Sequence, residues 1–233
     1  MRMSDQFAIA TLCSAGYLHW LEHLHRNLLL LRPGLHRLTV CVTDQQTRAA
    51  ARMLQLDTLV VGDTTERRHA TAHTFGTEAY ARVTRHKASC VLGIMTRRRP
   101  PPALLFTDTD VTFFASPWPH LPLHTADIAL LDDSGPSQAT HNTLSSSLFF
   151  VRNTLPLREL WRELISHNAA RPELPDQLAL NRLLANRTGP GLRVARLDPA
   201  RFVNGYRFYE RNRSRHEVRP QQALSLTLTL APP

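Results

Sequence analysis

The stretch ALLFTDTD, residues 103–110, decides the fold class of this chain. Its first residues, Ala103 to Phe106, form a short apolar run, as expected for a strand that is buried inside a sheet. Two aspartates, Asp108 and Asp110, follow the run at positions i and i+2. Ligands of open α/β sheets bind at the carboxyl ends of the strands. The stretch therefore predicts a central strand that carries two carboxylates into a ligand site.

Strand and helix patterns alternate along the rest of the chain. Short apolar runs predict strands at 7–13, 38–42, 58–61, 127–131 and 147–151. Helical spacing and capping residues predict helices at 19–31, from Thr43-Asp44 to about 54, and at 77–95, 157–166 and 176–184. This rhythm is typical of an α/β fold. Because no repeat or linker interrupts it, we expect one domain over residues 1–233, with a doubly wound, mostly parallel sheet and flanking helices.

Charge and composition narrow the class of partner. The chain carries a net charge of +9, but 27 of its 28 basic residues are scattered arginines, which argues against a nucleic-acid partner. No apolar run approaches the roughly 18 to 20 residues that span a bilayer, so we expect no membrane span. Neither a signal peptide nor an anchor is recognisable, so the expected protein is soluble. The three cysteines, Cys13, Cys41 and Cys90, lie in apolar stretches and are expected to be buried thiols without a disulfide.

The spacing of Asp108 and Asp110 suits a divalent cation. Side chains at i and i+2 of an extended segment point the same way, so both carboxylates can reach one ion. Hard cations such as Mg²⁺ and Mn²⁺ prefer oxygen ligands and can bind a diphosphate through their open positions. The pair therefore predicts an Mn²⁺ or Mg²⁺ site that holds a phosphate-bearing ligand.

Several further segments, in a fixed order, resemble one known family. They are Phe75-Gly76-Thr77 with Tyr80 and Lys87, Leu104 to Val111, Ser116-Pro117, Leu148 to Thr154, Trp161, Asp176 to Asn181, Leu197-Asp198-Pro199, Phe202 and Asn204-Gly205. Together they are similar to the nucleotide-diphospho-sugar transferase family that includes plant cell-wall xylosyl- and arabinosyltransferases. The resemblance implies a GT-A-like fold and a metal-dependent, retaining glycosyltransferase. It also implies a nucleotide-diphosphate sugar as donor, a UDP-sugar first of all, while the glycan or protein acceptor stays open.

The resemblance also suggests roles for individual residues. Asp108 and Asp110 match the metal site. Four further positions match donor-binding positions: Lys87, Ser146, Gln177 and Asn204. Asp176 is a candidate for stabilising the reacting sugar, and so is Asp133, because it follows a predicted strand; an exposed turn is the alternative interpretation of Asp133. Asp176 also follows Pro175 at a predicted helix start, where a helix cap is the alternative interpretation.

Two departures from the family pattern bear on activity. Ser145-Ser146-Ser147 stands where the family has Asn-Ser-Gly or Asn-Thr-Gly, and a serine in place of the glycine would crowd the donor sugar. After Asn204-Gly205 the family's His-x-Asn segment does not follow, and His216 has no matching neighbours. Residues 224–230 instead alternate apolar and hydroxyl side chains, which predicts an edge strand without a metal ligand. We therefore expect a truncated or divergent C-terminal part and weak turnover, with a Golgi location only if an N-terminal anchor precedes this sequence.

Two alternatives remain open from the sequence. The first is an inactive homologue that binds a nucleotide sugar without transferring it. The second is a haloacid-dehalogenase-like phosphatase, because Asp108 to Thr112 also fits the DxDxT pattern with Asp108 as nucleophile. Such phosphatases need a cation downstream of the motif, commonly a lysine, and no lysine follows Lys87.

Overall fold

The computed structural model describes residues 7–31, 38–62, 73, 77–133, 143–187, 191–204 and the backbone of 225–227. The helices are α1 Leu18–Leu31, α2 Gln45–Met53, α3 Glu78–Thr84, α4 His86–Thr96, α5 Leu155–Ala170 and α6 Asp176–Arg187, with short 3₁₀ turns at Ala15–Tyr17 and Trp118–His120. The strands are β1 Phe7–Cys13, β2 Leu38–Val42, β3 Asp57–Val60, β4 Ala103–Thr107, β5 Val111–Phe113, β6 Ile128–Asp132, β7 Leu144–Arg152, β8 Val194–Arg196, β9 Phe202–Asn204 and β10 Ser225–Thr227.

Seven strands form one mixed sheet in the order β3-β2-β1-β4-β7-β6-β8. All neighbouring pairs are parallel except the two that involve β7, which runs antiparallel to both β4 and β6. The predicted α/β class and mostly parallel sheet are confirmed, with one reversed strand. Because of this reversal, β7 begins at the end of the sheet where β4 finishes, and the middle residue of β7, Leu148, pairs with the last residue of β4, Thr107.

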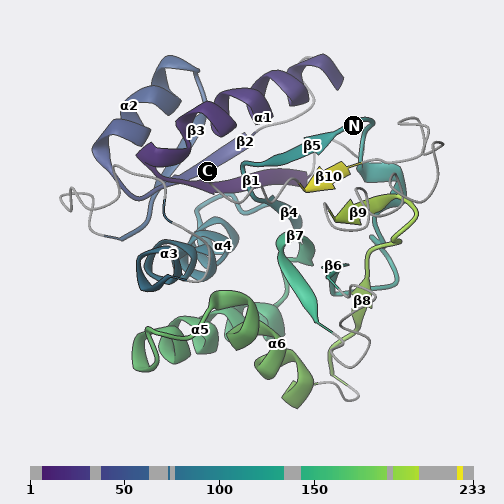
Figure 1. Cartoon of the computed structure of the whole chain (residues 1–233). Helices are drawn as coiled ribbons and strands as arrows, with labels where there is room; N and C mark the ends of the chain where they lie inside the picture. The colour runs from purple at the N-terminus through teal and green to yellow at the C-terminus, as the bar shows by residue number, and fades with distance from the viewer. Residues whose placement is uncertain are drawn as a thin grey trace, which may run out of the picture.

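Helices cover both faces of the sheet (Figure 1). Alternate residues of each strand point to opposite faces, so Ala8 and Ala10 pack in the core beneath α4, α5 and α6, while Ile9 packs beneath α1 and α2. In the first core, Phe149 stacks between Phe106 and Trp161, with ring centroids 4.9 and 5.4 Å away. This two-sided burial explains why the strands read as continuous apolar runs.

A second sheet has three strands in the order β5-β10-β9. The predicted strand at 224–230 is present at Ser225–Thr227, but its prediction as an edge strand is wrong: β10 pairs with β5 on one side and with β9 on the other. Its location depends on pairing with β9 and with β5, and β5 lies more than a hundred residues upstream, which the local alternation does not encode. The rest of the predicted tail, including His216, lies outside the described residues, as do Phe75, Gly76 and Gly205.

The helix predicted at 77–95 is divided by one turn residue, Arg85, into α3 and α4. Thr77 caps α3 by accepting a hydrogen bond from the Tyr80 amide at 3.2 Å. Asp44 caps α2 as expected, because its side chain accepts from the Thr47 amide at 2.7 Å. Within the described part of the chain, no helix is long and apolar enough to cross a membrane.

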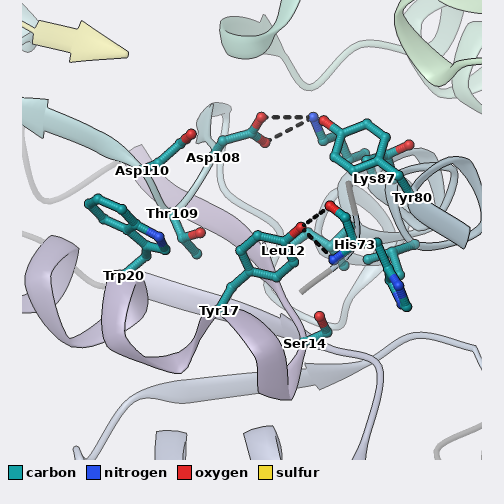
Figure 2. Close-up of a pocket in the computed structure, with 12 residues that line it drawn as sticks. Leu12, Ser14, Tyr17, Trp20, His73, Tyr80, Lys87, Asp108, Thr109 and Asp110 are labelled. Atoms are coloured by element: carbon teal, nitrogen blue, oxygen red, sulfur yellow. Dashed lines mark hydrogen bonds and ion pairs between the residues drawn. The ribbon is translucent and has the colours of Figure 1, made fainter. Parts of the chain in front are cut away.

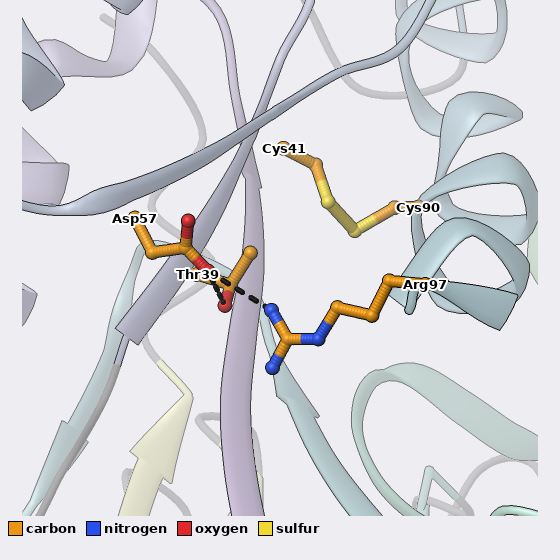
Figure 3. The surroundings of a disulfide bond; sticks show 5 residues. All are labelled: Thr39, Cys41, Asp57, Cys90 and Arg97. Carbon is orange, nitrogen blue, oxygen red and sulfur yellow. Dashed lines mark hydrogen bonds and ion pairs between the residues drawn. A yellow bond between two sulfur atoms is a disulfide. The ribbon is translucent and has the colours of Figure 1, made fainter. Parts of the chain in front are cut away.

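The expectation that no cysteines pair is wrong. Cys41 of β2 and Cys90 of α4 form a disulfide with a Cα–Cα distance of 5.7 Å (Figure 3). Forty-nine positions separate them, and α4 brings Cys90 to the sheet only once the helix packs on that face. An ion pair between Arg97 and Asp57, at 2.9 Å, joins the end of the same helix to β3. Cys13 remains a buried free thiol, and burial raises its pKa.

Candidate functional site

Strand β4 delivers Asp108 and Asp110 to one pocket at the carboxyl edge of the sheet (Figure 2). The pocket measures about 120 Å³, and Lys87 also contributes to its lining. The turn after β4 is anchored by the Asp108 amide, which donates to the Ser147 carbonyl oxygen at 2.7 Å. Both aspartates therefore lie where the sequence predicts them, at the carboxyl edge of the sheet. Ligands of open α/β sheets bind at this edge.

Lys87 forms a close ion pair with Asp108. Its Nζ lies 2.9 Å from Oδ1 and 3.0 Å from Oδ2 of that carboxylate. A second carboxylate, Asp176, lies 3.7 Å away, and the Phe106 ring centroid is 5.8 Å from Nζ. Burial alone would lower the pKa of Lys87, but the charges of Asp108 and Asp176 outweigh burial and raise it. The lysine therefore stays charged inside the protein.

Negative charge exceeds positive charge at this end of the sheet. Burial, and then the charge of Asp108, raise the pKa of Asp110 to about 7. Burial also raises the pKa of Asp108, against the lowering effect of Lys87. Asp108 and Asp176 flank the single ammonium group, and Asp110 lies in the same pocket as Lys87 and Asp108.

Ser146 reaches this cluster because β7 is irregular at its start. The register of the pairing between β6 and β7 shifts between Leu130 and Leu131, so Ser146 has no partner residue on β6. Bulges of this kind change the direction in which side chains point. The Ser146 hydroxyl donates to Oδ2 of Asp176 at 2.8 Å. Its amide donates to Oε1 of Gln177 at 3.2 Å. The start of α6 and the start of β7 are thereby locked together beside Lys87.

Gln177 extends the network to the last two predicted residues. Its Nε2 donates to Oδ2 of Asp133 at 3.0 Å. Asn204, at the end of β9, donates to Oδ1 of Asp133 at 3.4 Å and to the Asp132 carbonyl oxygen at 3.2 Å.

The eight predicted site residues thus fall into two groups. Three of them line the pocket: Lys87, Asp108 and Asp110. Five form a connected layer that is not part of its lining: Asp133, Ser146, Asp176, Gln177 and Asn204.

The aromatic part of the lining consists of Tyr17, Trp20 and Tyr80, and none of the three is a predicted site residue, although Tyr80 belongs to a segment that resembles the family. The Tyr17 hydroxyl donates to the His73 carbonyl oxygen at 3.0 Å and accepts from the His73 amide at 3.2 Å. A signal for two of these residues was available, because Tyr17 and Trp20 follow the carboxyl end of the first strand and are three residues apart, on one side of a helical turn.

Asn181 is a second residue whose role the sequence did not show. Its side chain accepts from the amide of Leu144 at 2.9 Å and donates to the Leu144 carbonyl oxygen at 2.7 Å. This pair of hydrogen bonds holds the first residue of β7 against α6. Among the described residues, no group of three or more His, Cys, Asp or Glu side chains is arranged as a metal site.

Three solved structures with a similar fold are glycosyltransferases. The galactosyltransferase LgtC, in complex with donor and acceptor sugar analogues, matches with a TM-score of 0.61 and 12% identity over 96% of this chain and 87% of that chain. A glycosyltransferase involved in glycosylation of the major capsid of PBCV-1 matches with a TM-score of 0.60 and 10% identity, over 96% and 94%. GlyE of Streptococcus pneumoniae TIGR4 matches with a TM-score of 0.58 and 13% identity, over 94% and 53%. These likenesses show a GT-A fold.

The sequence itself matches a family model. No curated protein sequence matches the chain closely enough to count as a relative. The model of the nucleotide-diphospho-sugar transferases, however, matches residues 33–229, which include all eight predicted site residues. A match over most of the chain, on a fold shared with known glycosyltransferases, agrees with the carboxylates at the end of β4. The chain belongs to the nucleotide-diphospho-sugar transferase family.

Proposed function

We propose that this protein is a metal-dependent, retaining glycosyltransferase that uses a UDP-sugar or a related nucleotide-diphosphate sugar. One observation carries the proposal: Lys87, Asp108 and Asp110 share one pocket at the carboxyl edge of the sheet in a member of this family. The family and the fold favour this activity over the phosphatase alternative.

The residues present fit a divalent cation. Asp108 and Asp110 offer oxygen ligands of the kind that Mg²⁺ and Mn²⁺ prefer. When the carboxyl groups of Asp108, Asp110 and Asp176 are all ionised they exceed the single ammonium by two charges, and a divalent ion would favour that ionised state and balance it. When bound, the ion would supply positive charge next to the diphosphate, where negative charge grows as the nucleotide leaves.

The proposed reaction exchanges one bond at the anomeric carbon of the donor. The bond from that carbon to the diphosphate oxygen breaks, and a bond to the acceptor oxygen forms on the same face, which retains the configuration. The acceptor proton passes to the departing diphosphate. Lys87 would bind phosphate oxygens, and the aromatic wall of Tyr17, Trp20 and Tyr80 would bind the donor's flat or apolar parts. Asp133 and Asp176 support the network behind the pocket and are the candidate stabilisers of the sugar.

Donor binding tests this function directly. We expect UDP to raise the melting temperature when Mn²⁺ is present, because a ligand at about 100 times its Kd adds about 2.7 kcal/mol to the free energy of unfolding. Asp110→Asn should abolish the Mn²⁺-dependent part of the shift. Glu173→Gln, which removes an exposed carboxylate away from the pocket, serves as the matched control and should behave as wild type. Equal shifts in wild type and Asp110→Asn would contradict a metal site at this position.

One observation favours the second candidate, a nucleotide-sugar-binding protein with little or no turnover. The described residues supply only two carboxylates to the pocket, and Lys87 occupies one of them. Release of UDP from a panel of UDP-sugars distinguishes the candidates. Turnover well below that of a complete family member, with UDP binding retained, would indicate the second.

A further inference from the structure

Lys87 is the single lysine of the chain, and its ammonium group is fixed between two acids. The side chain is only 7% exposed. Both oxygens of Asp108 lie within 3.0 Å of Nζ, so the carboxylate faces the lysine symmetrically. A divalent cation that binds Asp108 at the usual distance of about 2.0 to 2.6 Å needs at least one of these oxygens. Lys87 and a metal ion would therefore compete for the carboxylate of Asp108.

A second place for the ammonium group is already built beside the first. Asp176 lies 3.7 Å from Nζ. The carbonyl oxygen and the hydroxyl of Ser146 lie 3.4 and 3.5 Å away. Each of these three distances exceeds the usual upper limit of about 3.2 Å for an N–H···O hydrogen bond by about 0.5 Å or less. Lys87 can thus release Asp108 without becoming a buried cation that lacks a partner.

Asp176 is held in the orientation that this role needs. The Ser146 hydroxyl donates to its Oδ2, the same oxygen that is nearest to Lys87. The residue is 6% exposed and does not line the pocket, so in this arrangement its carboxylate faces the lysine rather than a ligand.

We propose that Asp176 is a positioning residue: it takes over Lys87 when a divalent cation takes Asp108. This inference rests on the proposed function, because it concerns the same site. Lys87 is the counter-ion of Asp108 in the metal-free protein. It shifts to Asp176 and Ser146 when the metal binds, and it is then held at the edge of the pocket, where a phosphate would lie.

The single lysine makes the exchange directly observable. Protein labelled with ¹⁵N-lysine gives one side-chain Nζ signal, without interference from other residues. We expect this signal to move when Mg²⁺, which is diamagnetic, is added to saturation. Asp110→Asn should remove the movement, because it removes a metal ligand. A signal that stays in place in metal-saturated wild type would overturn the exchange.

Mn²⁺ affinities, measured by calorimetry, test the part played by Asp176. Lys87→Met should bind Mn²⁺ about tenfold more tightly or better, because a unit positive charge a few ångströms from the ion is removed. Asp176→Asn should weaken binding several-fold in the wild-type background, since Asp108 is then the one charged partner that the described residues offer Lys87. In the Lys87→Met background the same change should have a much smaller effect. Glu173→Gln is the matched control for loss of a remote carboxylate.

The outcomes separate this inference from the function beneath it. Equal losses from Asp176→Asn in both backgrounds would mean a simple charge effect, and the positioning role would be wrong. If wild type binds Mn²⁺ but Lys87→Met binds it no more tightly, Lys87 does not compete with the metal ion for Asp108. The proposed metal site would still be supported. If neither protein binds Mn²⁺ or Mg²⁺, both the metal-dependent function and the exchange fail.

Discussion

The side-chain amide of Gln177 donates from Nε2 to the carboxylate of Asp133 at 3.0 Å. Its other end, Oε1, accepts from the Ser146 amide at 3.2 Å. One residue at the start of α6 thus joins the carboxyl end of β6 to the start of β7. These two hydrogen bonds fix the distance between the end of β6 and the start of β7. Both segments carry residues of the predicted donor site.

Gln177→Glu should break one of these contacts and keep the other. The carboxylate can still accept from Ser146, but it now faces the acceptor Asp133 with a like charge. We expect a loss of about 1 to 3 kcal/mol in the free energy of unfolding at pH 7, measured by urea denaturation. The double variant Asp133→Asn/Gln177→Glu restores a donor opposite an acceptor and should recover most of the loss. If the single variant Gln177→Glu is as stable as wild type, the hydrogen bond between Gln177 and Asp133 contributes nothing to stability.

Gln55 is the one described non-glycine residue with a positive φ, 58°. It ends α2 in a Schellman arrangement, in which the Leu56 amide donates to the Ala51 carbonyl oxygen and the Gln55 amide to that of Arg52, both at 2.9 Å. Glycine adopts this conformation without a steric penalty. Gln55→Gly should therefore stabilise the protein by up to about 1 kcal/mol, while Gln55→Ala should not. A loss of stability with glycine would mean that the Gln55 side chain makes a contact worth more than the strain.

Asp127 provides a pH-dependent contribution away from the site. Its carboxylate accepts from the amide, Nε and Nη2 of Arg193 at 3.0, 3.1 and 2.9 Å. The hydrogen bonds from Arg193 hold the pKa of Asp127 below its ordinary value. A depressed folded-state pKa adds stability above the unfolded-state pKa of about 3.9, and the contribution is lost as the pH falls through the folded-state value.

Asp127→Asn should accordingly be less stable than wild type at neutral pH, and the difference should shrink as the pH falls from about 5 towards 2. Urea midpoints at several pH values measure it. Asp198→Asn, a change at an exposed aspartate near the end of β8, controls for the loss of one acidic charge. A difference that does not depend on pH would assign the effect to packing instead.

Much of the sheet was predictable because its strands carry their own pattern. Ala103 to Phe106 and the aspartates after them indicate a buried strand that ends at a ligand site, and the structure has the buried strand and a pocket at its end. The direction of β7 was not predictable from the run of residues, since burial patterns do not depend on strand polarity. That reversal is what brings Ser146 to Lys87, two residues that are 59 positions apart.

The candidate site was predictable where the resemblance supplied residues in a known order. It was less predictable where tertiary packing alone brings residues together. Asp176 could be explained locally as a helix start, but its contacts with Ser146 and Lys87 depend on the packing of α6 against β7 and α4. Tyr17 and Trp20 were missed although their place after the end of β1 was a signal, because a helical pattern by itself does not distinguish an aromatic that faces a pocket from one that faces the core. The metal and donor roles themselves stay predictions.

The disulfide was missed because a buried thiol and a buried half-cystine look alike in sequence. Cys41–Cys90 closes a loop of 49 positions between β2 and the helix that carries Lys87. Cross-links of this kind stabilise chiefly by restricting the unfolded chain, so Cys41→Ser/Cys90→Ser should cost about 2 to 4 kcal/mol. Urea denaturation with and without a reducing agent measures this cost, and the double variant should not respond to the reductant.

Cys13 supplies the control for that experiment, because it is a free thiol in the core on the opposite face of the sheet. Cys13→Ala removes a thiol but leaves the cross-link, so its stability should still fall on reduction by the same amount as in wild type. Thiol counting in denaturant gives an independent measurement: one reactive thiol without reductant and three after reduction. Three reactive thiols before reduction, with no effect of the reductant on stability, would mean that the disulfide is absent and that α4 is held on the sheet by packing and by the ion pair between Arg97 and Asp57 of β3.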